Sequence, residues 1–410
     1  MKVAQINVTY GNADSTGRNV KELHDYLLEK KIDSYVFVSK INDGSQADNR
    51  IRLFSSDADR KMHALLSRFT GKQGYFSYFS TRRLIAELKV INPSVVILHV
   101  LHGNCVNLPE LFKYLSKNNT SVIIVLHDCW FFTGHCCHYT YENCAKWQGD
   151  CHRCPQIHEW NESWFFDTAS KCLKDKKQWF KKISHLGVIG VSDWITGEVN
   201  RSIIKDAAMI QRIYNWIDVE VFKPRCTESL RERLGIAKNT KVLLGVAFHW
   251  DKQKGLKEML LIARSIPESK VIMIGMIPEN VVTPKNMICV GTVTDPIELS
   301  EYYSMADVFL NPSVQETFGK TTVEALSCGT PVVAYKTTAC TELVGEKCGA
   351  VVSVIDAEQY LETLKDVLRY PKSEYEISCR ESAVKRFDKG KCLDQYLSFI
   401  NKMDAWENQK

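Results

Sequence analysis

The chain has 410 residues, of which 45% are apolar and 25% are charged. This length exceeds the size at which one hydrophobic core usually keeps growing, and the composition is that of an ordinary globular protein, so we expect two domains. The net charge of +5 is too small to indicate nucleic acid, and no such partner is expected.

The N-terminus is predicted to form a first strand and not an export signal. It lacks the long apolar core and the cleavage site of a signal peptide, and no run approaches the roughly 18 apolar residues of a membrane span. We therefore expect a cytoplasmic protein, in which the 15 cysteines stay reduced or bind metal.

Short apolar strands alternate with helical patterns along the first half of the chain, which is typical of a parallel sheet with helices on its faces. The predicted strands are 3–8, 34–38, 95–99, 122–126 and 186–191, with helices such as 19–29 and 82–89 between them. Residues 1–211 are interpreted as a first doubly wound α/β domain.

A glycine-containing turn at 11–18 follows the first strand. Gly11 and Gly17 permit close approach of another group to the backbone, and Ser15 or Thr16 can cap the helix that follows. A plain turn between a strand and a helix has the same composition, so the turn alone does not establish a binding site.

Histidines stand at the ends of two later strands. His127 and Asp128 follow the strand 122–126, and His99 and His102 end the strand before it. An imidazole at this edge of a sheet can orient a substrate or transfer a proton, and Asp128 can fix the tautomer of His127. The alternative is a histidine that only caps the strand end. His99 and His102 are expected to line the part of the site that binds a second substrate, the acceptor.

The segment after Asp128 is rich in cysteine and histidine, and 129–158 is interpreted as an insertion. Four of its cysteines have the spacing C-x7-C-x6-C-x2-C, namely Cys136, Cys144, Cys151 and Cys154. Four thiols with one C-x2-C pair are typical of a structural zinc site. The sequence predicts such a zinc ion, with free packed thiols or a disulfide as alternatives.

Aromatic residues and lysines are interleaved beyond the cysteines, at 164–166 and 174–182. Such a segment can rest on anionic lipid as a peripheral contact on the inner face of the membrane. An amphipathic helix with a basic, solvated face is the simpler interpretation.

A polar stretch at 212–240 is predicted to be a linker. Strands are then predicted at 242–247, 271–274, 287–290, 308–310 and 332–335, and they define a second α/β domain at 241–390. The segment 391–410 is predicted to form a terminal helix that packs back on the first domain. Doubly wound sheets bind ligands at the carboxyl ends of their strands, so the predicted site lies in the cleft between the domains.

The most informative stretch runs from the strand end near 310 through Gly319 into a helix. A helix that begins there directs its unpaired amides and its positive dipole end toward phosphate. Glu316 precedes this helix and Glu324 lies about 7.5 Å along it. Two carboxylates flanking a phosphate site can accept hydrogen bonds from the hydroxyls of two sugars joined by a diphosphate, which describes a nucleotide sugar. Two solvated helix carboxylates are the alternative.

The spacing Glu316-x7-Glu324, with Phe318 and Gly319 inside it and Cys-Gly-Thr-Pro at 328–331 after it, resembles the signature of family 4 glycosyltransferases with the GT-B fold. The segments Asp-Cys-Trp, Phe-Thr-Gly-His-Cys, Cys-x-Lys-Trp and Cys-x2-Cys-Pro within 128–155 are similar to a subgroup that acts in exopolysaccharide, capsule and lipopolysaccharide biosynthesis. The resemblance implies two Rossmann-like domains with the active site in the interdomain cleft.

The resemblance also implies roles for individual residues. Glu316 contacts hydroxyls of the transferred sugar, Glu324 holds the ribose, and Lys254 stabilises the departing diphosphate. The implied donor-binding residues are Gly17, Arg18, Lys252, Lys254, Gly275, Thr292, Glu316, Thr317, Phe318, Gly319, Lys320 and Glu324. The implied catalytic residues are His127, Asp128, Lys254 and Glu316.

Two positions depart from the pattern of similar enzymes. Phe248 stands where an arginine is usual, so Lys252 is the candidate for the second phosphate contact, and an exposed loop lysine is the alternative for Lys254. Trp216 replaces a glycine in the linker, which predicts a stiffer hinge.

The predicted reaction is a retaining, metal-independent transfer of a hexose from a nucleotide-sugar donor to a saccharide acceptor, which is expected to be lipid-linked. No Asp-x-Asp motif follows a strand, so we expect no catalytic cofactor, and zinc only in a structural role. The alternatives are a nucleotide-sugar epimerase or hydrolase on the same fold, and a zinc-dependent binding protein with an inactive cleft.

Overall fold

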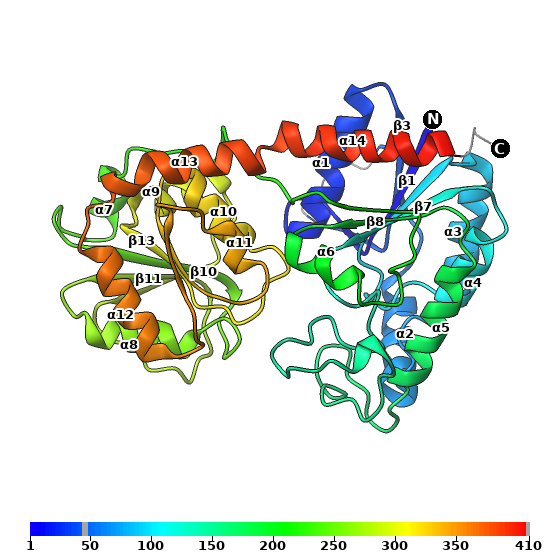
Figure 1. Ribbon diagram of the computed structural model, residues 1–410, viewed down its shortest axis with the longest axis horizontal. Helices are drawn as coiled ribbons and strands as arrows, with labels where there is room; N and C mark the ends of the chain where they lie inside the picture. The colour runs from blue at the N-terminus through cyan, green and yellow to red at the C-terminus, as the bar shows by residue number, and fades with distance from the viewer. Residues whose placement is uncertain (43–47, 407–410) are drawn as a thin grey trace. The chain divides into compact units, whose positions relative to one another are not determined.

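The computed structural model describes residues 1–42 and 48–406. It divides into two compact units, one formed by Met1–Ile213 with Leu393–Lys410 and the other by Tyr214–Cys392. Each unit is built on a parallel β-sheet flanked by helices (Figure 1). The protein is therefore an α/β protein with two Rossmann-like domains, as the alternation of strands and helices predicts.

The sheet of the first unit has the strand order β5-β3-β1-β6-β7-β8-β9, and every pair is parallel. Its strands are β1 Lys2–Ile6, β3 Asp33–Val38, β5 Ile51–Leu53, β6 Val95–Leu98, β7 Ser121–Leu126, β8 Leu186–Gly190 and β9 Met209–Arg212. The central strands β6 and β7 are wholly buried, because a parallel sheet covered on both faces requires nearly continuous apolar runs. A separate parallel pair joins β2 Thr9–Tyr10 to β4 Lys40–Ile41.

The helices of the first unit connect these strands. They are α1 Ser15–Glu29, α2 Asp57–Thr70, α3 Tyr78–Ile91, α4 Leu108–Leu115, α5 Ala169–Lys181 and α6 Asp193–Val199. The connection between β7 and α5, residues 127–168, contains the predicted insertion 129–158, and from here on we call the whole connection the insertion. Its only regular element in the described part is the 3₁₀ helix η1 Lys146–Gln148. Figure 1 shows this segment as a lobe of loops.

The last helix, α14 Lys389–Ala405, enters the first unit from Leu393 onward. The Ser121 hydroxyl on β7 donates a hydrogen bond to the Met403 carbonyl at 2.8 Å. A Cβ atom on Gly187 would lie 2.9 Å from the Met403 sulfur, so the glycine in β8 permits this close contact. The end of the chain is thus packed on the first sheet.

The sheet of the second unit has the order β12-β11-β10-β13-β14-β15, again all parallel. Its strands are β10 Val242–His249, β11 Lys270–Met276, β12 Met287–Gly291, β13 Val308–Asn311, β14 Val332–Tyr335 and β15 Gly349–Val352. Its helices are α7 Glu228–Arg233, α8 Leu256–Ser265, α9 Pro296–Met305, α10 Lys320–Ser327, α11 Cys340–Leu343, α12 Ala357–Leu368 and α13 Ser373–Phe387.

Most of the stretch that we predicted to be a linker, 212–240, belongs to the second unit, which begins at Tyr214. Trp216 and Phe222 are buried, and the Arg380 guanidinium donates hydrogen bonds to the Val219 and Phe222 carbonyls. Because this stretch is mostly polar, its composition did not reveal these few packing and hydrogen-bond contacts. Trp216 is therefore a packed core residue, and the stretch is not a free connection.

Candidate active site

The start of α10 has the conformation that an anion site requires. Gly319 caps this helix with φ 89° and ψ 60°, a left-handed conformation that favours glycine, and no side chain caps the helix start. The Asn311 amide at the end of β13 donates to the Thr322 hydroxyl at 2.9 Å, which fixes the helix start against the strand. Unpaired amides with a positive dipole end can bind phosphate there.

Beside this helix start, Lys254 and Glu316 form an ion pair, with Nζ and Oε1 2.5 Å apart. Asp251 holds the lysine loop by accepting hydrogen bonds from the Gln253 and Lys254 amides at 2.8 and 2.9 Å. Burial by itself would lower the pKa of Lys254, but the Glu316 carboxylate outweighs burial and raises it. Lys254 is therefore a charged side chain held at the site.

Two loops are joined so that this ion pair keeps its place. The Gln315 side-chain amide donates to the Gln253 side-chain oxygen at 2.8 Å, and the Glu316 amide donates to the Thr338 hydroxyl at 2.8 Å. Gly255 has φ 80°, and a Cβ atom there would lie 2.3 Å from Pro312. The loop after β10 and the loop after β13 are thus in direct contact.

Glu324 is buried on α10 with an exposed fraction of 5%. It accepts a hydrogen bond of 2.9 Å from the hydroxyl of Tyr303, which is fully buried on α9. Because Glu324 is buried and Glu316 is paired with a lysine, neither is a solvated helix carboxylate. The simpler alternative that the spacing left open is therefore wrong.

The hydroxyl oxygen of Thr317 is buried and has no hydrogen-bond partner among the described residues. A buried hydroxyl without a partner costs about 1–3 kcal/mol. It lies two residues before Gly319, the N-cap residue of α10. A ligand at the helix start would supply the missing partner.

The other predicted donor residues of the second unit differ in exposure. Gly275 ends β11 with φ 116°, and a Cβ atom there would lie 1.7 Å from the Ala247 carbonyl oxygen, so no other residue fits. Phe318 is buried against Tyr214 and Phe387, and it fills the core below the site. Lys252 and Thr292 are exposed, and Lys320 is half-buried.

In the first unit, the glycine turn is organised by Asp14 and not by Ser15 or Thr16. Asp14 caps α1 by accepting a hydrogen bond from the Gly17 amide at 2.7 Å. A Cβ atom on Gly17 would lie 3.0 Å from the same carboxylate. The Arg18 guanidinium donates to the Asn12 carbonyl at 2.9 Å, so Arg18 folds back over its own turn.

The histidines at the ends of β6 and β7 pair differently from the prediction. His127 Nε2 lies 3.1 Å from His99 Nδ1, and His99 Nε2 lies 3.1 Å from Gln5 Oε1. Because the glutamine oxygen only accepts, His99 donates to it, and His127 must donate to His99. His99 therefore fixes the tautomer of His127, and the prediction that Asp128 does so is wrong.

Asp128 pairs instead with His102, with Oδ2 and Nε2 2.7 Å apart. Burial would raise the pKa of Asp128, but His102 and the Trp130 amide lower it to about 2. Burial would lower the pKa of His102, but Cys137 and Asp128 raise it well above its usual value. The two residues form a charged pair where the insertion begins.

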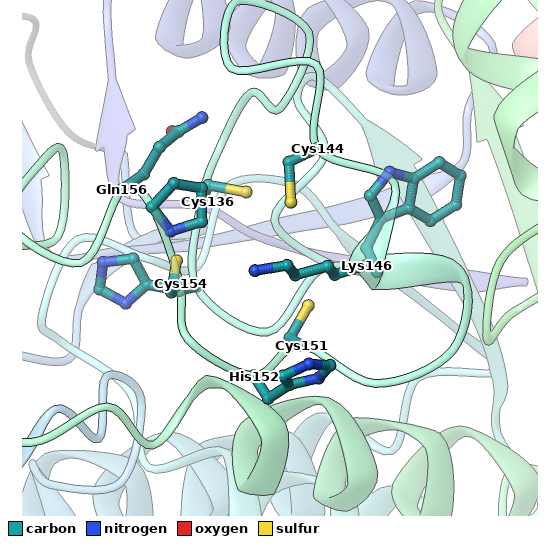
Figure 2. A pocket seen from close by; sticks show the side chains of 10 residues that line it. Cys136, Cys144, Lys146, Cys151, His152, Cys154 and Gln156 are labelled. Carbon is teal, nitrogen blue, oxygen red and sulfur yellow. The ribbon is translucent and has the colours of Figure 1, made fainter.

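The four predicted metal ligands meet in the insertion. Figure 2 shows the side chains of Cys136, Cys144, Cys151 and Cys154 directed into one small cavity, with Lys146 extending among them. Within residues 1–42 and 48–406, no three of these sulfurs lie within 4.8 Å of one another. In the same described residues, a different set of possible metal ligands does lie within 4.8 Å of one another, namely His102, Asp128 and Cys137.

An exposed apolar surface, which we call the aromatic patch, lies on α2 and on the loop before α5. Its members are Met62, Leu65, Leu66, Phe69, Trp164, Phe165 and Phe166. The Phe69 ring contacts Trp164 and Phe165 at centroid distances of 5.2 and 5.5 Å. The exposure of the α2 members was not expected, because apolar residues at 62, 65, 66 and 69 have the spacing of a core-facing helix.

Comparison with known proteins agrees with this architecture. Residues 240–370, most of the second unit, match the family Glycosyl transferases group 1. The second unit therefore contains a group 1 glycosyltransferase domain. The putative colanic acid biosynthesis glycosyl transferase WcaC of Escherichia coli (strain K12) is 24% identical to this chain over 287 residues, which cover 68% of each protein. Other curated relatives align over 34% to 58% of their own lengths.

Solved structures show the fold of the whole chain. Sucrose-phosphate synthase from Thermosynechococcus elongatus is 16% identical and superposes with a TM-score of 0.72, over 98% of this chain and 99% of that one. Anabaena Alr3699/HepE in complex with UDP-glucose is 15% identical, with a TM-score of 0.65 over 98% and 100% of the two chains. The fold is GT-B, as the motif resemblance implies.

Proposed function

We propose that this protein is a glycosyltransferase that moves a hexose from a nucleotide-sugar donor to a lipid-linked saccharide, with retention of configuration, in cell-surface polysaccharide biosynthesis. The observation that carries the proposal is the Lys254–Glu316 pair beside the uncapped start of α10. The colanic acid relative supports the biosynthetic context, and the UDP-glucose complex of a protein with the same fold supports the donor class.

The residues of the second unit suit the departure of a nucleoside diphosphate. Negative charge grows on the diphosphate as the bond to the sugar breaks, and Lys254 with the amides near Gly319 stabilises that charge. Glu316 accepts hydrogen bonds from sugar hydroxyls, and Glu324 accepts them from the ribose. We propose that this residue set performs the chemical step without a metal ion.

In this proposal the first unit binds the acceptor and also contacts the donor, through His127 and Arg18. His99 holds the His127 ring in a tautomer whose Nδ1 is the acceptor nitrogen, so His127 can orient a hydroxyl of the transferred sugar. Arg18 lies in the first turn of α1, the helix that Asp14 caps, and is proposed to meet the donor phosphate.

The aromatic patch supports a lipid-linked acceptor. Phe165 and Phe166 are 66% and 60% exposed, and such clustered exposed aromatic residues mark an interaction surface. The helix after them, α5, and its C-cap residue expose five lysines: Lys171, Lys174, Lys177, Lys181 and Lys182. Aromatic and basic side chains together suit the interface of an anionic membrane. None of the described helices is long and apolar enough to span a bilayer, so we propose a peripheral contact.

The donor is tested with a thermal-shift panel of nucleoside diphosphates and nucleotide sugars. A true donor at 100-fold over its dissociation constant should add about 2.7 kcal/mol of stability. The selected donor is then incubated with and without membrane extract that supplies lipid-linked acceptor. We expect sugar to enter the lipid fraction only when acceptor is present. Release of nucleoside diphosphate at full rate without acceptor would instead indicate a hydrolase.

The membrane contact is tested by sedimentation with anionic and neutral vesicles. We expect binding to anionic vesicles, and a loss of at least tenfold in the double variant Phe165→Ser with Phe166→Ser. The control is Phe79→Ser, which alters a phenylalanine on α3 that is 85% exposed outside the patch. Equal binding by all three proteins would rule out the aromatic patch as the membrane contact.

A further inference from the structure

We propose that Cys136, Cys144, Cys151 and Cys154 bind one zinc ion as four thiolates, and that this ion holds the insertion in its folded form. The inference does not depend on the reaction that the protein catalyses. It rests on the direction of the four side chains, on the size and lining of the cavity between them, and on the scarcity of other structure in this part of the chain.

The cavity has the donor set and the size of a metal site. Its volume is about 10 Å³, and the four cysteines line it, so it accepts a single ion and little else. Tetrahedral zinc with thiolate bonds of about 2.3 Å requires sulfurs about 3.8 Å apart. Because the side chains already converge (Figure 2), rotation about Cα–Cβ bonds and small loop movements close the site.

A positive charge already lies where the ion would bind. Lys146 reaches into the cavity between the sulfurs (Figure 2), and its ammonium donates a hydrogen bond of 2.9 Å to the Arg153 carbonyl. Lys146 is only half-buried, so its flexible side chain can turn out to solvent when the ion enters. The ammonium group thus stands in for the cation.

The backbone is shaped around the two ends of the site. Arg153, inside the Cys151-x2-Cys154 turn, has φ 49°, and Asn143, before Cys144, has φ 46°. The Cys154 amide donates to the Asp167 carboxylate at 2.7 Å. These turns bring Cys144 and the C-x2-C pair to the cavity from separate loops, as zinc sites with paired ligands do.

The insertion needs such a crosslink. Residues 127–168 contain one 3₁₀ helix in the described part and no strand, and small lobes without a large core are usually stapled by metal or disulfides. The Cys137 carbonyl, next to the first ligand, accepts a hydrogen bond of 2.8 Å from the Cys129 amide. Cys129 directly follows Asp128, so the proposed ion is linked to the end of β7.

Another set of metal-binding side chains lies close by and provides the rival assignment. His102, Asp128 and Cys137 have ligand atoms within 4.8 Å of one another. That set already forms a charged His102–Asp128 pair at 2.7 Å and has mixed ligands, whereas four thiolates select zinc. The two assignments differ in which cysteine substitutions should remove the metal.

The test is the metal content of the full chain, purified under reducing conditions and measured by elemental analysis. We expect one zinc ion per chain, and less than a tenth of that in Cys144→Ser and in Cys151→Ser. Cys226→Ser, an exposed cysteine outside the insertion, is the matched control and should keep the ion. Zinc retained in both insertion variants, or lost in Cys137→Ser, would overturn the assignment.

A second measurement uses the wild-type chain, so that it does not depend on the folding of a variant. A chelator should release the zinc and expose four additional thiols to a thiol reagent in the folded protein. Replacement of zinc by cobalt should give intense sulfur-to-cobalt charge-transfer absorption. A protein without zinc, or with disulfides in place of these thiols, contradicts the proposal. Nucleotide binding by the second unit should stay unchanged throughout, which separates this result from a failure of the proposed reaction.

Discussion

The proposed donor site of the second unit and the insertion of the first unit hold their side chains by different means. Glu316 and Lys254 stand on short loops after β13 and β10, and the sheet brings these loops together. The insertion has no sheet beneath its loops. Side chains make the connections instead. Lys176 of the neighbouring helix α5 is one example, because it donates hydrogen bonds to the Trp130 and Thr133 carbonyls of the insertion.

Lys176 shows that such a connection has an energetic cost, because a charged side chain must be buried to make it. It is fully enclosed on α5, with Nζ 3.7 Å from the centre of the Trp130 ring, and burial lowers its pKa to about 8. A regular sheet positions a loop without burying charge. A loop lobe must use buried polar side chains, packed aromatic rings and, in our proposal, a metal ion.

The largest expected effect is the loss of stability when one buried tryptophan is removed from the core of each region. Trp147 in the insertion packs on Phe132 and Tyr139 at 5.0 Å, and Trp250 in the second unit packs beneath β10. Each change to alanine should cost about 3–5 kcal/mol. We expect Trp147→Ala to accelerate proteolysis within 127–168 and to leave nucleotide affinity unchanged, whereas Trp250→Ala lowers that affinity.

Limited proteolysis and isothermal titration with the selected nucleotide measure the two effects. If Trp147→Ala also abolished nucleotide binding, the insertion and the donor site would form one cooperative unit, and the distinction between them would fail.

The next largest effect is expected on the rate of the reaction more than on the stability of the protein. Lys254→Ala should lower kcat by about 10²–10³-fold, or about 2.7–4 kcal/mol, because it removes a charge aimed at the leaving group. Its matched control is Lys257→Ala, which alters an exposed lysine on α8 and should leave kcat unchanged. Initial rates of transfer at saturating donor measure the difference. Equal rates in both variants would remove Lys254 from the mechanism.

The smallest effect is the pH dependence of the Asp128–His102 pair. The lowered pKa of Asp128 contributes stability above about pH 4, and this contribution is lost as pH falls toward about 2. The raised pKa of His102 contributes stability below about pH 6.5, and this contribution is lost as pH rises through the raised value. We therefore expect Asp128→Asn to destabilise the protein most, by about 2 kcal/mol, between pH 4 and 6.5.

Urea unfolding of the wild type and of Asp128→Asn across pH 3–9 checks this. Both proteins keep the four thiols of the insertion, so any pH dependence of metal binding cancels in the difference. A difference in unfolding free energy that does not vary with pH would show that the pair is not charged.

Much of the donor site follows from local sequence. The segment from Asn311 to Ser327 contains a strand end, a glycine in the left-handed region and a helix, and these local features alone determine where the uncapped amides lie. The Lys254–Glu316 contact joins residues 62 positions apart. Only the pairing of β10 with β13 brings them together.

The first unit shows where sequence patterns are insufficient. Asp128 follows His127 directly, which predicts that one orients the other, yet successive side chains at a strand end point in different directions. His127 therefore reaches His99, and Asp128 reaches His102. The cap of α1 is Asp14 because its carboxylate also accepts hydrogen bonds from the Thr9 and Asn42 side chains, partners that no local pattern reveals.

The sequence by itself determined the alternation of strands and helices, the turn at Gly319 and the spacing of the four cysteines. Each of these depends on residues near one another in the chain, where periodicity and glycine conformation act directly. The tertiary structure alone decided which histidine pairs with which carboxylate, that Trp216 is packed in the core, and that the apolar face of α2 is exposed. Those outcomes depend on which segments the sheets bring together, because a side chain's partner is chosen by distance in space and not by position in the chain.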